Sequence, residues 1–354
     1  MGSNTPQGGA IEGNAADDAL MVDQGQGKSL PSLPFMMYDG LVSQETGLFC
    51  RDSGARERAM AKEKTSEAKR VKARIAAIKE AHPNYQGILE LFERLILEQL
   101  KTKAKVEYRP PEIGIDRAII RAREGFPMLS RADFPIDSQL ATLLFRSICR
   151  ITKGENEKLK IEVENIQRAL RRKRIDLEVC FKKALEGDHG YLSRTAEDVG
   201  IDPGVMNFLL HTTIKPLVEV VASHLKDMVD EDAWDRGYCP ICGSQPLMGE
   251  LRGEEGKRIW MCSFCGTEWR GKRLMCPFCE NSDHHTLRYF HTEKERAYRI
   301  DICDKCKRYI KTVDSRQFVD EIFLFVEDIG TLHLDILAAE KGFKRETFNF
   351  LGVF

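Results

Sequence analysis

The chain has 354 residues, of which 42% are hydrophobic and 31% charged, and its formal net charge is −1. This length allows about two domains, and a charge so near zero argues against a protein drawn as a whole to nucleic acid or to an anionic membrane. Uninterrupted apolar runs are far shorter than the roughly 20 residues of a membrane span, and no secretory signal precedes them. We therefore expect a soluble, cytoplasmic protein without membrane insertion.

The N-terminal part of the chain is polar. Residues 1–47 are rich in Gly, Asn, Gln, Ser and Asp, a composition that buries too little apolar surface to fold, so they are predicted to form a disordered arm. Residues 55–81 mix Lys, Arg, Glu and Ala. We interpret this run as a solvated helix with charge pairs along its surface, with a nucleic-acid-binding arm as the alternative.

Helical periodicity dominates the next part of the chain. The first clear apolar stripe repeats at three and four residues and comprises Ile88, Leu91, Phe92, Leu95, Ile96 and Leu100. Such stripes are buried against one another in helical bundles, so residues 48–230 are predicted to form an α-helical domain. Prolines indicate a long connection over residues 109–134.

Capping residues define the later helices of this domain. Asp137 is placed to cap one helix and Gly187 to end another. The pair Asp202-Pro203 is placed to open a further helix, which Pro216 is expected to kink or restart.

Periodicity of the helical kind disappears near Tyr238, where short apolar runs, glycines and cysteine pairs replace it. This composition predicts two small metal-held subdomains of the rubredoxin-like or zinc-ribbon kind, over residues 238–272 and 273–315. Helical spacing returns at Ile329, Leu332, Ile336 and Ala339, which predicts a C-terminal helical segment over residues 316–354.

Eight of the eleven cysteines form four Cys-x-x-Cys pairs, namely Cys239/Cys242, Cys262/Cys265, Cys276/Cys279 and Cys303/Cys306. A Cys-x-x-Cys turn aims two thiolates at one ion, and two such turns complete a tetrahedral site for Zn²⁺ or rubredoxin-type iron. Intervals of 19 and 23 residues within each predicted site suit hairpins, and the interval of 10 between the sites suits a linker. We therefore predict two metal ions per chain, iron or zinc, bound by consecutive sets of four cysteines, with a crossed pairing as the alternative.

The residues after the knuckles differ between the two predicted sites. Gly243 and Gly266 follow the second cysteine of the first two knuckles, where a left-handed backbone lets amide N–H groups reach the sulfurs. Glu280 and Lys307 occupy the equivalent positions of the second site. Because these residues tolerate that backbone less well, we expect the second site to be looser or less tightly metallated.

The cysteine sites favour a structural role. Four sulfurs leave no open coordination position for water, and no catalytic motif is present, so we expect a protein that is not an enzyme. A structural support for a binding surface is the first interpretation; the alternatives are a rubredoxin-like redox protein and a zinc-ribbon nucleic-acid binder. His284 and His285 are further candidate ligands, although Asp283 to His285 is more simply a surface turn.

The cysteine-rich half resembles a known family, that of the formate dehydrogenase accessory protein FdhE. The resemblance is carried by Tyr238-Cys-Pro-Ile-Cys-Gly, Met261-Cys-Ser-Phe-Cys-Gly-Thr-Glu-Trp269, Cys276-Pro-Phe-Cys279 and Cys303-Asp-Lys-Cys306. The end of the chain, Leu332-His-Leu-Asp-Ile-Leu-Ala-Ala-Glu-Lys-Gly-Phe343, is similar to the closing helix of the family.

This resemblance implies a helical domain joined to two rubredoxin-like metal subdomains, with the eight cysteines as ligands. It also implies a cytoplasmic chaperone that binds the catalytic subunit of respiratory formate dehydrogenase and helps it mature before export. A homodimer is compatible with this role.

Glu268-Trp269-Arg270 follows the second knuckle directly and is the candidate partner-binding segment. A ring held by a metal-bound knuckle loses little entropy on binding, and Glu268 and Arg270 would supply polar contacts around it. The alternative is that Trp269 packs over the four-cysteine centre and shields it.

Overall fold

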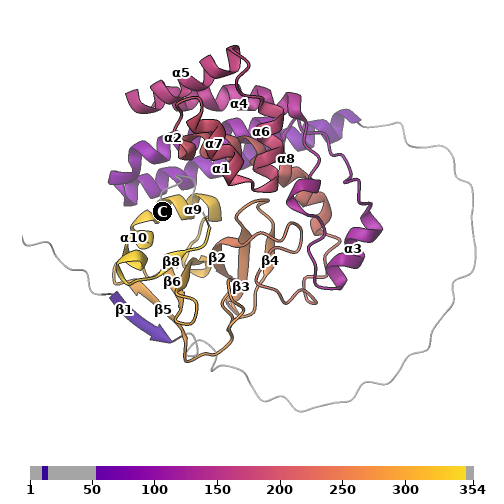
Figure 1. The fold of residues 1–354 in the computed structure, drawn as a ribbon. Coiled ribbons are helices and arrows are strands. Elements are labelled where there is room, and N and C mark those ends of the chain that lie inside the picture. Colours follow the sequence, from indigo (N-terminus) through magenta and orange to yellow (C-terminus); the bar gives the residue numbers. More distant parts are fainter. Residues whose placement is uncertain (1–9, 15–52, 348–354) are drawn as a thin grey trace, which may run out of the picture.

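The computed structural model describes residues 10–14 and 53–347, and Figure 1 shows a helical region above a sheet. The helical region contains α1 (Ser53–Ala81), α2 (Gln86–Lys103), α3 (Ile115–Arg123), α4 (Ser138–Lys153), α5 (Glu157–Arg171), α6 (Leu177–Glu186), α7 (His189–Glu197) and α8 (Pro203–Lys226). The sheet region contains β2 (Pro246–Arg252), β3 (Lys257–Cys262), β4 (Glu268–Arg270), β5 (Leu287–Thr292), β6 (Tyr298–Cys303) and β7 (Arg308–Asp314), followed by α9 (Leu324–Gly330), α10 (Leu332–Glu340) and β8 (Lys344–Arg345). The predicted fold class is confirmed.

The predicted helix boundaries depend on caps that the structure contains. Asp137 accepts hydrogen bonds from the amides of Gln139 and Leu140, both at 2.9 Å, at the start of α4. Asp202 caps α8 through the amide of Gly204 at 2.8 Å. Gly187 ends α6 in the left-handed conformation with φ 77°. These short polar and glycine signals are local, which is why the sequence alone locates them.

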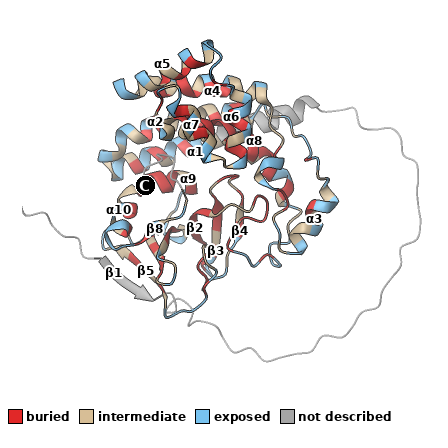
Figure 2. Cartoon of the chain, in the orientation of Figure 1, coloured by how far each residue is buried: buried red, intermediate tan, exposed pale blue. Residues whose placement is uncertain are grey.

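The core of the helical region forms around α8, against which α2, α4, α6 and α7 pack. Figure 2 shows buried residues along these helices where they face one another. α8 continues through Pro216, where a kink or restart was expected. A proline leaves the carbonyl four residues earlier without its helical donor, and here the Gln99 side-chain amide donates to that carbonyl, of Thr212, at 2.7 Å.

Among the described residues, α8 is also the helix that is long and apolar enough to cross a membrane by length and composition. Most of that apolar stretch is buried inside the protein, and a core helix meets the same criteria.

The solvated helix predicted for residues 55–81 is wrong over its C-terminal half. Val71, Ile75 and Ile78 are 0%, 0% and 4% exposed and face the core. Between them, the Arg74 guanidinium binds both carboxylate oxygens of Glu327 in α9, at 2.6 and 2.7 Å. Over residues 67–81, whose side chains the structure describes, three buried apolar residues stand among many charged ones, so the composition of the run gives no sign of a buried face.

The predicted connection over residues 109–134 contains α3 and packs on the sheet region. The amides of Met128 and Leu129 donate to the carbonyls of Pro240 and Ile241, each at 2.9 Å. Pro240 and Ile241 lie inside the first Cys-x-x-Cys knuckle. The segment therefore joins the helical region to the first cysteine site.

The described strands form one sheet in the order β1-β5-β6-β7-β2-β3-β4, with β8 beside β7. β1 (Ala10–Asn14), within the predicted disordered arm, pairs antiparallel with β5, and the rest of that arm lies outside the described residues. β2, which follows the first knuckle, and β7, which follows the fourth, pair in parallel and join the two cysteine sites. Across this seam, Arg258 of β3 binds Asp301 of β6 at 3.0 Å. The subdomain boundaries predicted from the sequence stay a prediction.

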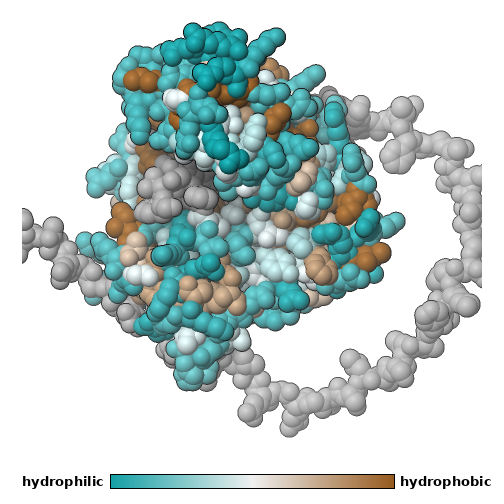
Figure 3. All heavy atoms as spheres, viewed as in Figure 1, coloured by the Kyte–Doolittle hydropathy of each residue, from teal (hydrophilic) through white to brown (hydrophobic). Residues whose placement is uncertain are grey.

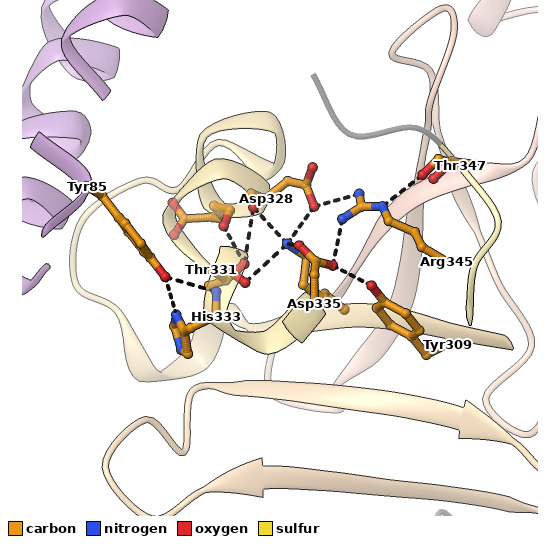
Figure 4. A network of polar contacts seen from close by, with 10 residues as sticks. Tyr85, Tyr309, Asp328, Thr331, His333, Asp335, Arg345 and Thr347 are labelled. Carbon is orange, nitrogen blue, oxygen red and sulfur yellow. Dashed lines mark hydrogen bonds and ion pairs between the residues drawn. The ribbon is translucent and has the colours of Figure 1, made fainter. Parts of the chain in front are cut away.

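A buried charge cluster joins the C-terminal helices to the sheet (Figure 4). The Lys311 ammonium of β7 lies 2.9 Å from Asp328 and 2.8 Å from Asp335. Arg345 binds the same two carboxylates at 2.8 Å each, and the Tyr309 hydroxyl donates to Asp335 at 2.7 Å. Two cations balance two carboxylates, and the lysine and both aspartate side chains are at most 1% exposed. This balance makes burial of the charges tolerable.

Replacing Asp335 by Asn is expected to destabilise the protein by about 3–5 kcal/mol, because it leaves buried cations without their partner. Urea unfolding of the metal-loaded protein measures this change. The control Lys101→Gln removes an ion pair to Glu98 in which the lysine is 71% exposed, and its unfolding midpoint should stay close to that of the parent. Equal midpoints for the two variants would contradict the structural importance of the cluster.

Candidate metal centres

The Cys-x-x-Cys knuckles share one local geometry. The amide of the first cysteine donates to the carbonyl five residues later: Cys239 to Ser244 at 2.9 Å, Cys262 to Thr267 at 2.8 Å and Cys276 to Asn281 at 2.9 Å. In the fourth knuckle, Cys303 is instead the β6 partner of Arg308 in β7. Each turn reverses the chain and presents both sulfurs on one side.

The structure brings the cysteines together in the two consecutive sets predicted from their spacing, Cys239, Cys242, Cys262 and Cys265 in one and Cys276, Cys279, Cys303 and Cys306 in the other. In the first set, the Cys239–Cys265 and Cys242–Cys262 sulfur distances are 3.6 and 3.4 Å. In the second set, the Cys276–Cys306 and Cys279–Cys303 distances are both 3.7 Å.

These distances fit a tetrahedral metal site. A zinc–sulfur bond of about 2.3 Å gives a tetrahedron whose sulfur–sulfur edges are about 3.8 Å. In both sets, the first cysteine of one knuckle contacts the second cysteine of the other. The two centres therefore have the same approximate twofold arrangement, and each can hold one metal ion.

A left-handed residue follows each knuckle in both centres. Gly243 and Gly266 have φ 72° and 68°, and Glu280 and Lys307 have φ 54° and 57°. The amides of Gly243, Glu280 and Lys307 each donate to the carbonyl of the first cysteine of their knuckle. The second centre thus adopts the backbone of the first at the cost of two strained residues, each about 1–2 kcal/mol. Its looser metal binding stays a prediction.

The electrostatics of the clusters require a cation. Burial raises the pKa of the Cys239 and Cys265 thiols, and it raises the pKa of Cys306 to about 11. Although burial opposes the ionisation of Cys242 and Cys303, hydrogen bonds from neighbouring groups lower the pKa of both, so one thiol of each centre is favoured to ionise before the others. Buried thiols of this kind do not ionise together unless a positive charge lies among them. The amides of Phe264 and Cys265 both point at the Cys262 sulfur, 3.4 Å away, and help to orient and stabilise it.

The two centres differ in burial. All four cysteines of the first are buried, whereas Cys279 and Cys306 of the second are partly exposed. Around the first centre, the Arg131 guanidinium lies over the Phe264 ring, 4.1 Å from its centroid, and Phe134 packs edge-on against the same ring. Sequence reasoning missed Arg131, because its distance along the chain from the cysteines gives no local signal.

The candidate partner-binding segment lies in β4. Trp269 is 1% exposed, packs edge-on against Trp260, and donates from its indole nitrogen to the Arg236 carbonyl at 3.4 Å. Such a buried ring favours the packing alternative over a direct partner contact. Arg270 is exposed and binds Asp232 at 2.6 Å, and Glu268 binds Arg252 at 2.8 Å. Partner binding through this segment stays a prediction.

The candidate ligands His284 and His285 do not lie among the sulfurs of the second centre. Asp283, His284 and His285 are exposed, and the two rings lie 3.9 Å apart. The amide of His285 donates to the Asp283 carboxylate at 3.0 Å, as in a polar surface turn. This agrees with the interpretation as a surface turn, although the ligand atoms of the three residues lie within 4.8 Å of one another and could also hold an ion.

The geometry defines a class: a helical domain joined to a sheet that carries two closed four-cysteine metal centres. Comparison with known domains identifies the family. The central domain of FdhE matches residues 238–273, and the C-terminal domain of FdhE matches residues 274–351. Residues 238–351 of the chain therefore carry both FdhE domains, and the chain is similar to FdhE proteins.

Individual relatives agree with this assignment. An FdhE homolog of Aquifex aeolicus is 27% identical over 285 residues, which cover 79% of this chain and 93% of that protein. Protein FdhE of Escherichia coli is 32% identical over 117 residues, which cover 32% of this chain and 37% of that protein. The crystal structure of the FdhE protein from Pseudomonas aeruginosa shares the fold, with a TM-score of 0.58 at 23% identity, over 80% of this chain and 94% of that one. The two FdhE domains and these likenesses support the expected class of formate dehydrogenase accessory protein.

The double variant Cys239→Ser/Cys242→Ser should reduce the metal content from two ions per chain to one. The first centre loses two ligands, and the second keeps all four because the sets do not share a sulfur. Metal analysis of the purified protein gives the ratio, and circular dichroism of the helices controls for unfolding. Loss of both ions from a folded variant would contradict the separation of the centres.

Gly243→Ala is expected to destabilise the protein by about 1–2 kcal/mol or more, because the new side chain must adopt a left-handed backbone and its Cβ would lie 2.7 Å from Pro127 Cγ. Lys307→Gly is the matched reverse change in the second centre and relieves strain, so its stability should equal or exceed that of the parent. Urea unfolding of metal-loaded protein compares them. Equal destabilisation by both changes would exclude backbone strain as the cause.

Proposed function

We propose that this protein is a non-catalytic accessory protein that binds the catalytic subunit of a respiratory formate dehydrogenase in the cytoplasm, before export. The observation that carries the proposal is the pair of closed four-cysteine centres within the two FdhE domains. Four sulfurs fill a tetrahedral shell, so neither centre offers an open position for a substrate or water. The metal ions then stabilise a surface rather than perform chemistry.

The nucleic-acid alternative is weakened by the pairing of charges around the first centre. Arg270 and Lys272 bind Asp232 and Asp235 at 2.6 and 2.9 Å. Arg252 binds Glu268 at 2.8 Å. Neighbouring carboxylates thus offset basic groups that would otherwise contact phosphates.

A redox role is the second candidate, and the partial exposure of Cys279 and Cys306 favours it. An iron bound at this centre would lie near the surface, where electrons can be exchanged with a partner. Protein purified without oxygen distinguishes the two roles: a red, reversibly reducible centre supports electron transfer, and colourless protein with two zinc ions supports a structural role.

The surface that we propose for the client lies over α3, beside the first centre. Ile120 and Phe126 are 54% and 58% exposed, and Figure 3 shows hydrophobic surface at the position of α3. The Tyr238 hydroxyl, next to the first knuckle, donates to the Gly125 carbonyl at 2.9 Å. We call Ile120, Phe126, Arg236 and Arg270 the α3 face.

This face has the composition of an interaction site. Exposed aromatic and aliphatic groups supply apolar contact, and arginines supply polar contacts at the rim. The Arg236 side chain lies against Gly125, and the Arg236 carbonyl accepts the hydrogen bond from the Trp269 indole. Trp269 therefore holds the backbone of Arg236 in place, and Arg270 is the next residue along β4.

Phe126→Asp is expected to reduce capture of the formate dehydrogenase catalytic subunit at least tenfold, because it replaces the most exposed apolar side chain of the α3 face by a charge. The measurement is affinity purification of tagged full-length protein, with metal analysis of the same preparation. Leu143→Asp is the matched control, since Leu143 is 62% exposed on α4, and it should capture the subunit normally. Arg270→Glu should weaken capture to a smaller extent.

Equal capture by the Phe126 and Leu143 variants would exclude the α3 face. Failure of the metal-loaded parent protein to capture the subunit would instead contradict the accessory function itself.

A further inference from the structure

Two histidines and a glutamate from three distant parts of the chain meet between the helical region and the sheet. His82 directly follows α1, Glu295 lies in the turn between β5 and β6, and His333 lies in the first turn of α10. The His82 Nε2 atom is 2.9 Å from Glu295 Oε1, and the His333 Nε2 atom is 2.6 Å from Glu295 Oε2. Their ligand atoms all lie within 4.8 Å of one another.

Backbone hydrogen bonds constrain Glu295, and ring stacking constrains the two histidines. The Glu295 amide donates to the Thr292 carbonyl at 3.3 Å, and the Glu295 carbonyl accepts from the Tyr298 amide at 3.1 Å, which fixes the turn. The two imidazole rings lie 5.4 Å apart between centroids, and the Tyr85 ring stacks on both. Because the backbone and the rings are constrained, the three ligand atoms converge without the loss of much side-chain entropy.

Tyr85 adds a feature that is typical of metal-bound histidines. Its hydroxyl lies 3.1 Å from His333 Nδ1 and accepts the His333 backbone amide at 2.9 Å (Figure 4). A histidine that binds a metal through Nε2 carries its proton on Nδ1 and donates it to a neighbouring oxygen, which fixes the ring orientation. The Tyr85 oxygen is placed to be that acceptor.

The donor set indicates the kind of ion. Imidazole nitrogen favours zinc, copper, nickel or iron over the hard cations magnesium and calcium. The His82, Glu295 and His333 side chains are 26%, 19% and 30% exposed, so an ion can enter from solvent. Three protein ligands also leave a coordination position for water, unlike the closed cysteine centres.

We propose that His82, Glu295 and His333 form a third metal site, which binds a divalent transition ion such as Zn²⁺ and fastens the helical region to the C-terminal part of the sheet. The ligands come from the end of α1, the β5–β6 turn and α10, so a single ion would cross-link segments that are far apart in the sequence. This site is independent of the eight cysteines and of the proposed accessory function.

The test uses full-length protein whose two cysteine centres have first been filled with Zn²⁺, followed by titration with Co²⁺. The parent protein should bind one further ion, with weak visible bands and without the intense sulfur-to-cobalt absorption of a thiolate site. Added Zn²⁺ should abolish these bands by competition, and it should raise the thermal unfolding midpoint by binding the folded state.

Variants assign the further ion to its ligands. His82→Ala and His333→Ala should each weaken its binding at least a hundredfold, and Tyr85→Phe should weaken it about tenfold through the lost orienting contact. The double variant His284→Ala/His285→Ala is the matched control, because it removes the exposed histidine pair, and it should bind Co²⁺ like the parent.

Three outcomes would overturn the proposal. Binding that survives loss of His82 and His333 would place the ion elsewhere, and binding lost only in the His284/His285 variant would place it in the exposed turn. The third outcome is that the parent protein binds no third ion, and that its unfolding midpoint depends on pH while that of the His333 variant does not. The cluster would then consist only of hydrogen bonds between the two histidines and the Glu295 carboxylate.

Discussion

The convergence of eight cysteine sulfurs on two points is the constraint on which the C-terminal half depends. Each knuckle reverses the chain through a left-handed residue, and two strands run directly into a knuckle: β3 ends at Cys262 and β6 at Cys303. The direction of these strands is therefore set by the position of the sulfurs. The sheet region also buries an apolar cluster that includes Met248, Phe290 and Ile300, and we infer that metal binding adds to the free energy that orders it.

The first centre also determines where the helical region lies. Amides of Met128 and Leu129 bind carbonyls within the first knuckle, and Phe264 of the second knuckle packs against Phe134 and Arg131. Glu219 of α8 lies against Gly266 and is bound by Lys103 and Lys215 at 3.1 and 2.9 Å. Burial opposes the ionisation of Glu219, but the two lysines outweigh it and lower its pKa to about 2. The carboxylate is thus charged at every physiological pH, and its ion pairs join α2 to α8 beside the first centre.

Polar contacts join the C-terminal helices to α1 and to the sheet. Arg74 of α1 binds Glu327 of α9 through two hydrogen bonds, and Tyr298 of β6 donates to the same carboxylate at 2.6 Å. The buried cluster of Lys311, Asp328, Asp335 and Arg345 holds α9 and α10 against β7. Such contacts are directional, so they define the orientation of the C-terminal helices more narrowly than apolar packing does. Through Glu327 and Tyr298, α1 is thereby connected to α9 and to β6.

Local features of the sequence determined the helical domain, its caps and the composition of both metal centres. Asp137, Gly187 and Asp202 act within a few residues of their own positions, and the spacing of the cysteine pairs restricts which knuckles can meet. Only the tertiary structure decided the rest. The parallel pairing of β2 with β7 joins the two centres into one sheet, the ring of Trp269 is buried, and Glu280 and Lys307 adopt the left-handed backbone that their residue types disfavour. His82, Glu295 and His333 meet in space although no spacing rule relates them. Contacts between distant segments depend on how whole elements pack, and this packing leaves no periodic or local pattern in the chain.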